Sequence, residues 1–202
     1  MYVGHCEAYG DPMKTRSTTG RVVHTATQDW VPLGDGQSFK PIAFGPLASR
    51  QLLFRVESGA VVALHRHHGA VHAFTVSGRR VLLDPAGNID IEAGSYVYEP
   101  PGNVDSWMAV GNEACIIHIA IDGPMDTLDD AGNVVSSSGT PELRATYLAW
   151  CAEHDATPNS ALDVSSHRGR NGRRRWSMCM SIRCARSLGS RDDDWSRWSA
   201  KP

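Results

Sequence analysis

The chain has 202 residues, of which 41% are hydrophobic, enough for one domain with a packed core, and its five scattered cysteines argue against a disulfide framework. It has neither the ~18 consecutive apolar residues of a membrane span nor a basic start followed by an apolar run, so we expect a cytoplasmic protein without membrane contact. The formal net charge of −2 divides into −9 over residues 1–165 and +7 over residues 166–202, so we expect no nucleic-acid binding by the first segment.

Short strands dominate the first two thirds of the chain. Residues 1–20 are polar and irregular, and we expect a flexible arm there. From residue 21 to residue 122, short apolar runs alternate with turns rich in Gly, Pro and Asn. This pattern is typical of an all-β sandwich or barrel. The expected strands are residues 22–25, 39–44, 52–57, 61–67, 71–76, 79–83, 89–91, 95–99, 104–110 and 115–121, followed by a hairpin over residues 125–135.

One helix is expected after the strands. Thr140 is a suitable N-cap, and Pro141 favours the first helical position. We expect the helix to end near His154 and to cover one edge or face of the barrel, so that barrel and helix together occupy residues 21–157. The apolar stripe of this helix, at spacings of four, three and four, consists of Leu143, Tyr147, Trp150 and Cys151.

The last segment, residues 158–202, differs in character from the rest. Beyond residue 165 it holds ten basic and three acidic side chains and shows no helical or strand period. Basic side chains with interleaved tryptophans are compatible with a nucleic-acid-binding arm. A disordered tail, or a stretch translated out of frame from a GC-rich gene, are simpler interpretations, and we favour them.

Two histidines in the expected strand 61–67 are candidate metal ligands. Side chains alternate along a strand, so His65 and His67 share one face, together with Val61 and Ala63. We expect this face to line the barrel interior. Inward imidazoles are costly to bury unless they are hydrogen-bonded or bound to a metal. For an isolated pair, a position on the surface would be the alternative.

The pair is not isolated, because two cupin-like motifs occur in the right order. The spacing in this chain resembles the first motif of the cupin superfamily at Gly59, His65, His67 and Gly78. It resembles the second motif at Gly94, Pro100, Gly102 and Asp105. This resemblance implies an all-β cupin barrel (a double-stranded β-helix) with a metal at its centre, to which we add one C-terminal helix and a disordered tail. Cupins commonly pair, so we also expect a homodimer or a dimer of dimers.

Over roughly residues 28–155 the chain resembles the family of 2,4′-dihydroxyacetophenone dioxygenases. The likeness lies in DWVPLGDGQSFKPIAF, HRHHGAVHAFTVSGRR, AGSYVYEPPGNVDSW and LDDAGNVV. It implies an Fe(II) enzyme whose partners are an aromatic ketone and dioxygen. Such enzymes cleave the bond between the carbonyl and hydroxymethyl carbons of an aryl α-hydroxyketone, giving an arenecarboxylate and formate. The alternatives are a non-catalytic metal-binding cupin, serving as a sensor or small-molecule binding module, and an inactive paralogue.

The third metal ligand is where the chain departs from the family. Asp105 stands where the second cupin motif has a histidine. We favour His65, His67 and Asp105, because two histidines and one carboxylate form a recognised ligand set for non-haem iron. The carboxylate lowers the charge of the centre by one. His72 is an alternative because it also occurs in the family pattern, and His118 is another, although the isoleucines beside it favour an outward position.

Further residues are expected near the metal. Glu99, next to Pro100, either orients a liganding imidazole or is a charge at a strand end, and we treat it with His72 as a candidate catalytic residue. The default for Arg79 and Arg80 is solvation.

An apolar pocket is expected beside the metal to hold the aryl group. Trp107 lies two residues beyond Asp105, so it shares the face of that carboxylate and should line the pocket. Phe74 and Tyr98 are further pocket candidates, although we favour plain core packing as their role.

Overall fold

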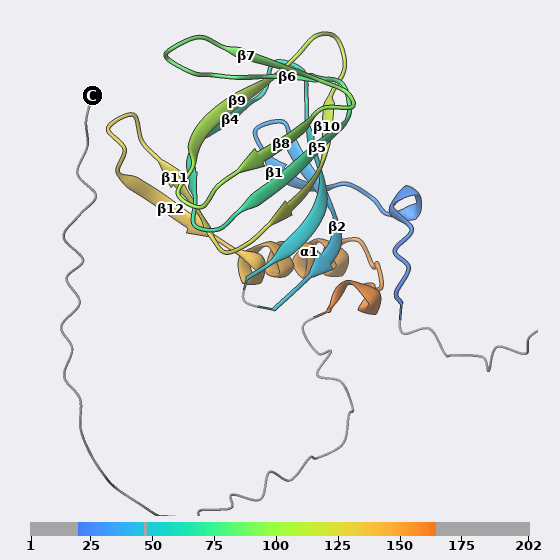
Figure 1. The fold of residues 1–202 in the computed structure, drawn as a ribbon. Coiled ribbons are helices and arrows are strands. Elements are labelled where there is room, and N and C mark those ends of the chain that lie inside the picture. Colours follow the sequence, from blue (N-terminus) through green and yellow to red (C-terminus); the bar gives the residue numbers. More distant parts are fainter. Residues whose placement is uncertain (1–19, 47, 165–202) are drawn as a thin grey trace, which may run out of the picture. The chain divides into compact units, whose positions relative to one another are not determined.

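The computed structural model describes residues 20–46 and 48–164, and in this part of the chain two six-stranded antiparallel sheets form a barrel (Figure 1). The first sheet has, in spatial order, β1 (Val31–Gly34), β2 (Gln37–Phe44), β3 (Arg50–Val56), β10 (Cys115–Ile121), β5 (Val71–Ser77) and β8 (Tyr96–Glu99). The second has β12 (Val134–Ser138), β11 (Met125–Leu128), β4 (Val61–His67), β9 (Val104–Val110), β6 (Arg79–Leu82) and β7 (Ile89–Glu92). The expected mostly-β fold is confirmed.

The first strand of the barrel differs from the expectation. Residues 22–25 are not a strand, and the chain instead forms a short 3-10 helix, η1 (Thr25–Thr27). β1 was not expected, because only Val31 in it is buried and no alternation is visible in VPLG. Pro32 is tolerated because β1 lies at the edge of its sheet, where one face of the backbone has no partner strand.

Alternation along the strands separates the core from the outer surface. In β5, Val71, Ala73 and Thr75 are buried, whereas the residues between them are exposed. In β10, Ile117 and Ile119 are buried on the same inner side. The inner faces of the two sheets therefore supply an apolar core, and the polar side chains found inside it need a specific explanation.

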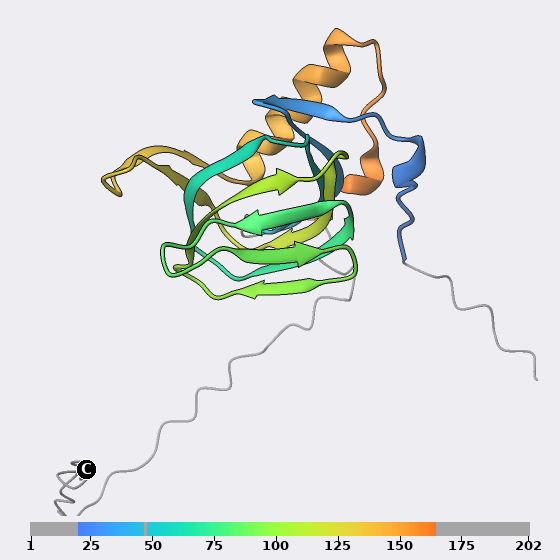
Figure 2. The same cartoon turned by 90° about the horizontal axis from the view of Figure 1, so that it is seen from above.

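The expected helix is confirmed as α1 (Thr140–Glu153), which contacts β1, β2 and β12 and lies on one side of the barrel (Figure 2). Its N-cap is Gly139 rather than Thr140: the Gly139 N–H donates to Glu142 Oε2 at 2.8 Å. The Thr140 hydroxyl instead donates to the carbonyls of residues 48 and 49, at 2.7 and 3.1 Å, and ties the helix to the turn before β3. No helix of the described residues is long and apolar enough to cross a membrane.

The structured part of the chain extends beyond the expected boundary after residue 157. A second 3-10 helix, η2 (Ser160–Leu162), packs on the barrel, and Leu162 is 1% exposed. The Val164 N–H donates to the Phe44 carbonyl at 3.1 Å. Residues 160–164, which were expected in the tail, therefore pack with the barrel and the helix. The expected arm before residue 20 and the expected tail after residue 164 lie outside the described residues.

Candidate metal centre

His65 and His67 lie at the end of β4 and point into the barrel, where they are 4% and 3% exposed. The expected direction is confirmed, but the expected reason is wrong. Val61 and Ala63 are exposed, and Val62 is buried. The pairing of β4 with β9 shifts register between Val62 and His65, so a bulge changes the alternation within the strand. The two histidines therefore share the interior with Val62.

Asp105 lies directly opposite His65 on the neighbouring strand β9. The His65 Nε2 and Asp105 Oδ1 atoms are 3.3 Å apart. The imidazole rings of His65 and His67 have centroids 4.8 Å apart at an interplanar angle of 86°. One ligand atom from each of the three residues lies within 4.8 Å of the others. The structure thus brings together the three residues favoured as ligands.

The hydrogen bonding of His65 shows why this group fits a cation. Its Nδ1–H donates to the Ala63 carbonyl at 2.8 Å, so in the neutral imidazole the lone pair is on Nε2. That lone pair faces Asp105 Oδ1, an acceptor with no hydrogen-bond partner among the described residues. Two buried acceptors at this distance repel each other unless a cation lies between them. Ligands of one ion at ~2.0–2.2 Å lie about 3–3.5 Å apart, so the pair fits a metal ion.

His67 is neutral at pH 7, as a metal ligand must be. Its pKa is lowered to about 3, mainly by burial and in part by the neighbouring His65 and Arg50. Its Nδ1 has no hydrogen-bond partner among the described residues. Binding a metal would satisfy this imidazole without charging it.

Glu99, at the end of β8, is a second carboxylate at the centre. It is 7% exposed, and its Oε2 lies 3.3 Å from His67 Nε2. Its pKa is raised to about 7, mainly by burial and also by Asp105, while the charge of Arg80 opposes both effects. Of its two expected environments, the structure places Glu99 against an imidazole and away from solvent.

Other expected site residues lie on the outer face of the barrel, and their assignment is corrected. His72 is exposed, and its Nδ1 lies 2.6 Å from the Tyr96 hydroxyl. Phe74 and Tyr98 are 44% and 53% exposed. His118 is half-buried and lies opposite Phe74 in the pairing of β10 with β5. The strand alternation that turns Val71 and Ala73 inward is the physical reason why His72 and Phe74 point away from the metal centre.

A cavity of about 220 Å³ adjoins the two histidines. Trp107, 4% exposed, and Phe54 form an edge-to-face pair in its wall, with ring centroids 6.1 Å apart. Arg80 also lines it and is 1% exposed, so the expected solvation of Arg80 is wrong. The start of α1 closes another part of the wall. The remaining lining is largely apolar and includes Leu52, Val62, Ile117, Ile119, Ile121 and Met125.

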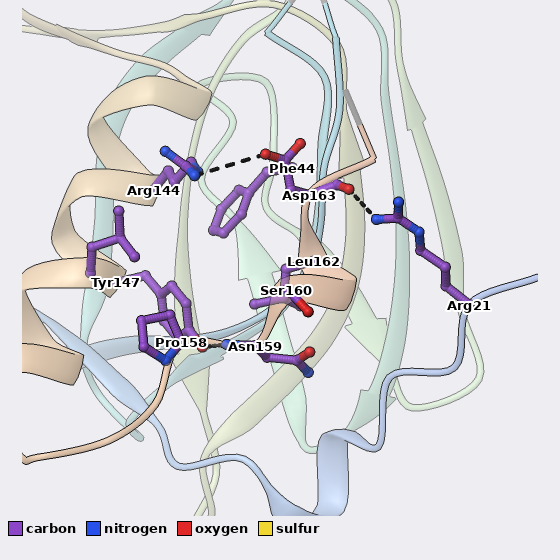
Figure 3. A pocket seen from close by; sticks show the side chains of 10 residues that line it. Arg21, Phe44, Arg144, Tyr147, Pro158, Asn159, Ser160, Leu162 and Asp163 are labelled. Carbon is purple, nitrogen blue, oxygen red and sulfur yellow. Dashed lines mark hydrogen bonds and ion pairs between the residues drawn. The ribbon is translucent and has the colours of Figure 1, made fainter. Parts of the chain in front are cut away.

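A second, larger cavity of about 410 Å³ lies between α1 and η2, away from the histidines (Figure 3). Arg144 Nη2 lies 3.8 Å from Asp163 Oδ2, and Arg21 donates to the Asp163 carbonyl. Phe44 and Tyr147 supply its apolar side, with ring centroids 6.1 Å apart. The cationic side chains here already contact acceptors, and the described lining holds no cluster of metal-ligating groups. The histidine cavity is therefore the better candidate site.

Comparison with known proteins agrees with this architecture. Residues 18–124 match the family described as the ChrR cupin-like domain. The chain is similar to an RmlC-like cupin protein from Ralstonia eutropha, with 22% identity, 71% of this chain and 94% of the other covered, and a TM-score of 0.64. It is also similar to an acetylacetone dioxygenase from Acinetobacter johnsonii, with 22% identity, coverage of 69% and 99%, and a TM-score of 0.59. No curated protein matches the chain. At these identities the structural likeness shows the cupin fold.

Proposed function

We propose that this chain, which belongs to the family of ChrR cupin-like domains, is an Fe(II) dioxygenase that cleaves an aryl α-hydroxyketone between its carbonyl and hydroxymethyl carbons. The products are an arenecarboxylate and formate, and dioxygen supplies both added oxygen atoms, so no external reductant is needed. The observation that carries the proposal is the group of buried His65, buried His67 and half-buried Asp105 beside an apolar cavity. Small-ligand sites commonly combine such a cavity with a few converging polar groups.

His65 and His67 would hold the iron by imidazole nitrogens, and Asp105 by a carboxylate oxygen. Two histidines and one carboxylate on one side of the ion leave open positions on the other. The bound iron would act as a Lewis acid for the substrate oxygens and support the reaction with dioxygen. Asp105 is itself held in place, because the Asn103 side-chain amide donates to its Oδ2 at 2.6 Å and leaves Oδ1 for the ion.

The cavity walls would seat the aryl group and exclude water. Trp107 and Phe54 present aromatic surfaces beside the histidines, and Ile117 and Ile119 add aliphatic ones. An apolar cavity of ~150 Å³ is enough for benzene. The 220 Å³ here suits a molecule with a single ring and a short oxygenated side chain.

Glu99 is the candidate acceptor for the proton that the hydroxyketone must lose. Its Oε2 has no hydrogen-bond partner among the described residues, and its side chain lines the same cavity as His67. A carboxylate within reach of the substrate hydroxyl can take that proton and later return it to a product. His72, on the outer face, has no part in this step.

Oxygen consumption by the iron-loaded protein tests the proposal. The protein is loaded with Fe(II) without air and then given dioxygen with 2,4′-dihydroxyacetophenone or, because of the structural neighbour, acetylacetone. We expect consumption of one dioxygen per ketone, with one labelled oxygen atom in each product. Asp105→Ala should be inactive, and His72→Ala should match the wild type. An iron-loaded protein that consumes no oxygen with either ketone would instead be a non-catalytic metal-binding cupin.

A further inference from the structure

Arg80 is the charged residue of the cavity that the proposed chemistry leaves without a role. It lies on β6 opposite Ala109 of β9 and Ile91 of β7, both buried, and is itself 1% exposed. Its neighbour Arg79 points the other way, into solvent, and pairs with Asp90 at 2.8 Å. Strand alternation thus aims one arginine outward and the next one into the cavity.

The Arg80 guanidinium has a free edge. Neither Nε nor Nη2 has a hydrogen-bond partner among the described residues, although both are buried. No carboxylate in the described part of the chain lies within ion-pair distance of Arg80. These two nitrogens lie on the same side of the planar group and form a fork that matches two oxygens of an anion. Leaving such donors buried and unpaired is costly, so this edge is available to an acceptor that enters the cavity.

The surroundings hold the guanidinium plane without occupying that edge. Its central carbon lies 5.0 Å from the centroid of the Trp107 ring, a cation–π contact. The other buried arginine of the cavity, Arg50, is already engaged: its Nη1 donates to the Gly123 carbonyl at 2.7 Å, and the charge of Glu142 stabilises it. Arg80 is therefore the buried arginine of this cavity with donors to offer.

The charges around the centre also favour an anionic ligand. Asp105 and Glu99 bring two negative charges when both are ionised, and Arg80 brings one positive charge. A divalent ion on the histidine–aspartate group would leave the centre with one net positive charge. A ligand that enters the cavity as a monoanion would balance this charge, whereas a neutral ketone would leave it unchanged, even after passing its proton to Glu99.

We propose that Arg80 is the anion-recognition residue of this cavity and that the substrate binds as an anion, with a planar oxyanion on the Nε–Nη2 edge of the guanidinium. This inference deepens the proposed function and rests on it for the identity of the cavity as the substrate site. An enolate and a carboxylate share the required chemistry. Arg80 then acts as a positioning and specificity residue, because it fixes one end of the substrate while the aromatic wall fixes its ring.

Binding of benzoate and of its neutral isostere benzamide tests the proposal. The measurement is calorimetric titration of the protein loaded with Zn(II), which binds ligands without consuming dioxygen. We expect the wild type to prefer benzoate by at least tenfold. Arg80→Met should lose that preference, and Arg80→Lys, which keeps the charge but not the fork, should lose part of it. Arg79→Met, the matched control on the exposed side of β6, should bind like the wild type.

The source of the oxyanion is distinguished by a second ligand. Acetylacetone absorbs ultraviolet light differently as an enolate, so its bound form can be followed by absorbance. If Arg80→Met lowers the bound enolate fraction as well as benzoate binding, the residue recognises the substrate enolate. If only benzoate binding falls, it recognises a carboxylate, which implies a keto-acid substrate.

Several outcomes would overturn the inference. They are equal binding of benzoate and benzamide by the wild type, no binding of either, or a benzoate preference that survives in a folded Arg80→Met protein. Folding of each variant is checked by thermal unfolding, and Arg80→Lys serves if Arg80→Met does not fold. A protein that takes up no metal would refute the proposed function, and the same ligand comparison in metal-free protein would still decide the role of Arg80.

Discussion

The inner and outer faces of the barrel carry similar side chains in opposite surroundings. On the inner face, His65 and His67 are buried, and their open nitrogens face carboxylate oxygens without hydrogen-bond partners. On the outer face, His72 is exposed and pairs with the Tyr96 hydroxyl. A histidine of this barrel is therefore a candidate ligand when it is buried and has an unsatisfied lone pair, whereas aromatic neighbours alone do not make it one.

The largest difference between the two faces should appear in stability. Trp107→Ala removes a buried ring that packs on Phe54, and we expect a loss of about 3–5 kcal/mol in the free energy of unfolding. Tyr98→Ala on the outer face should cost less than about 1 kcal/mol, because the ring is 53% exposed. Urea unfolding of metal-free protein measures both. Equal losses would mean that the outer face is also covered in solution, as in an oligomer.

Within the inner face, metal affinity should depend strongly on Asp105, the third ligand. We expect Asp105→Ala to weaken metal binding by at least about 100-fold, since even outer partners of ligands contribute about 10–100-fold. Asp105→His should keep the metal and, by supplying the usual cupin ligand, raise oxygen uptake with hydroxyketones. Asp90→Ala, which removes an exposed carboxylate paired with Arg79, is the matched control. An unchanged metal affinity in Asp105→Ala would mean that Asp105 is not a metal ligand.

In the metal-free protein, His67 and Glu99 should have opposite effects on how stability depends on pH. His67 has a pKa of about 3 when folded against 6.5 when exposed, so the unfolded state binds more protons in that window. The free energy of unfolding therefore falls as the pH drops from about 6.5 to about 3. Glu99 has a pKa of about 7 against 4.5, so the folded state binds its proton first, and stability rises as the pH drops from about 7 to about 4.5.

Removing the Glu99 carboxyl should make the effect of His67 on the pH dependence of stability visible. Glu99→Gln leaves only the His67 effect, so between about pH 6.5 and 4.5 this variant should lose stability on acidification more steeply than the wild type. Glu92→Gln, at an exposed position on β7, should follow the wild type. Thermal unfolding at several pH values measures the slopes. If stability depends on pH in the same way in Glu99→Gln and in the wild type, burial does not raise the pKa of Glu99.

Much of the barrel could be predicted because most strands keep a clear alternation, as β5 and β10 do. The direction of the two histidines was expected for a wrong reason. The bulge between Val62 and His65 depends on pairing with β9, and no local feature of the segment GAVVALHRH specifies it. Contact with a distant strand therefore decided which side of β4 faces inward.

Strand alternation in the sequence is enough to place Phe74 on the outer face and Arg80 on the inner face. Phe74 has the opposite alternation from Val71 and Ala73, so a pocket position for it conflicted with an apolar inner face of β5. Arg80 lies opposite Ile91 in the hairpin of β6 and β7, and an apolar partner in that register indicates the inner side.

The extension to residue 164 could not be seen in the sequence. Leu162 is one apolar residue in a polar stretch, and its burial depends on a surface that α1 and β2 create together. Asp163 also forms an isolated parallel β-bridge with Phe44.

Metal titration of three proteins distinguishes a metal centre on the inner face of the barrel from one that involves the outer face. Calorimetric titration with Fe(II) in the absence of air is applied to the wild type, His65→Ala and His72→Ala, each checked for folding. Because His65 is buried against Asp105 and His72 is exposed, we predict one ion per chain for the wild type and for His72→Ala, and no tight binding by His65→Ala. Tight binding that survives in His65→Ala, or that is lost in His72→Ala, would contradict a metal centre on the inner face.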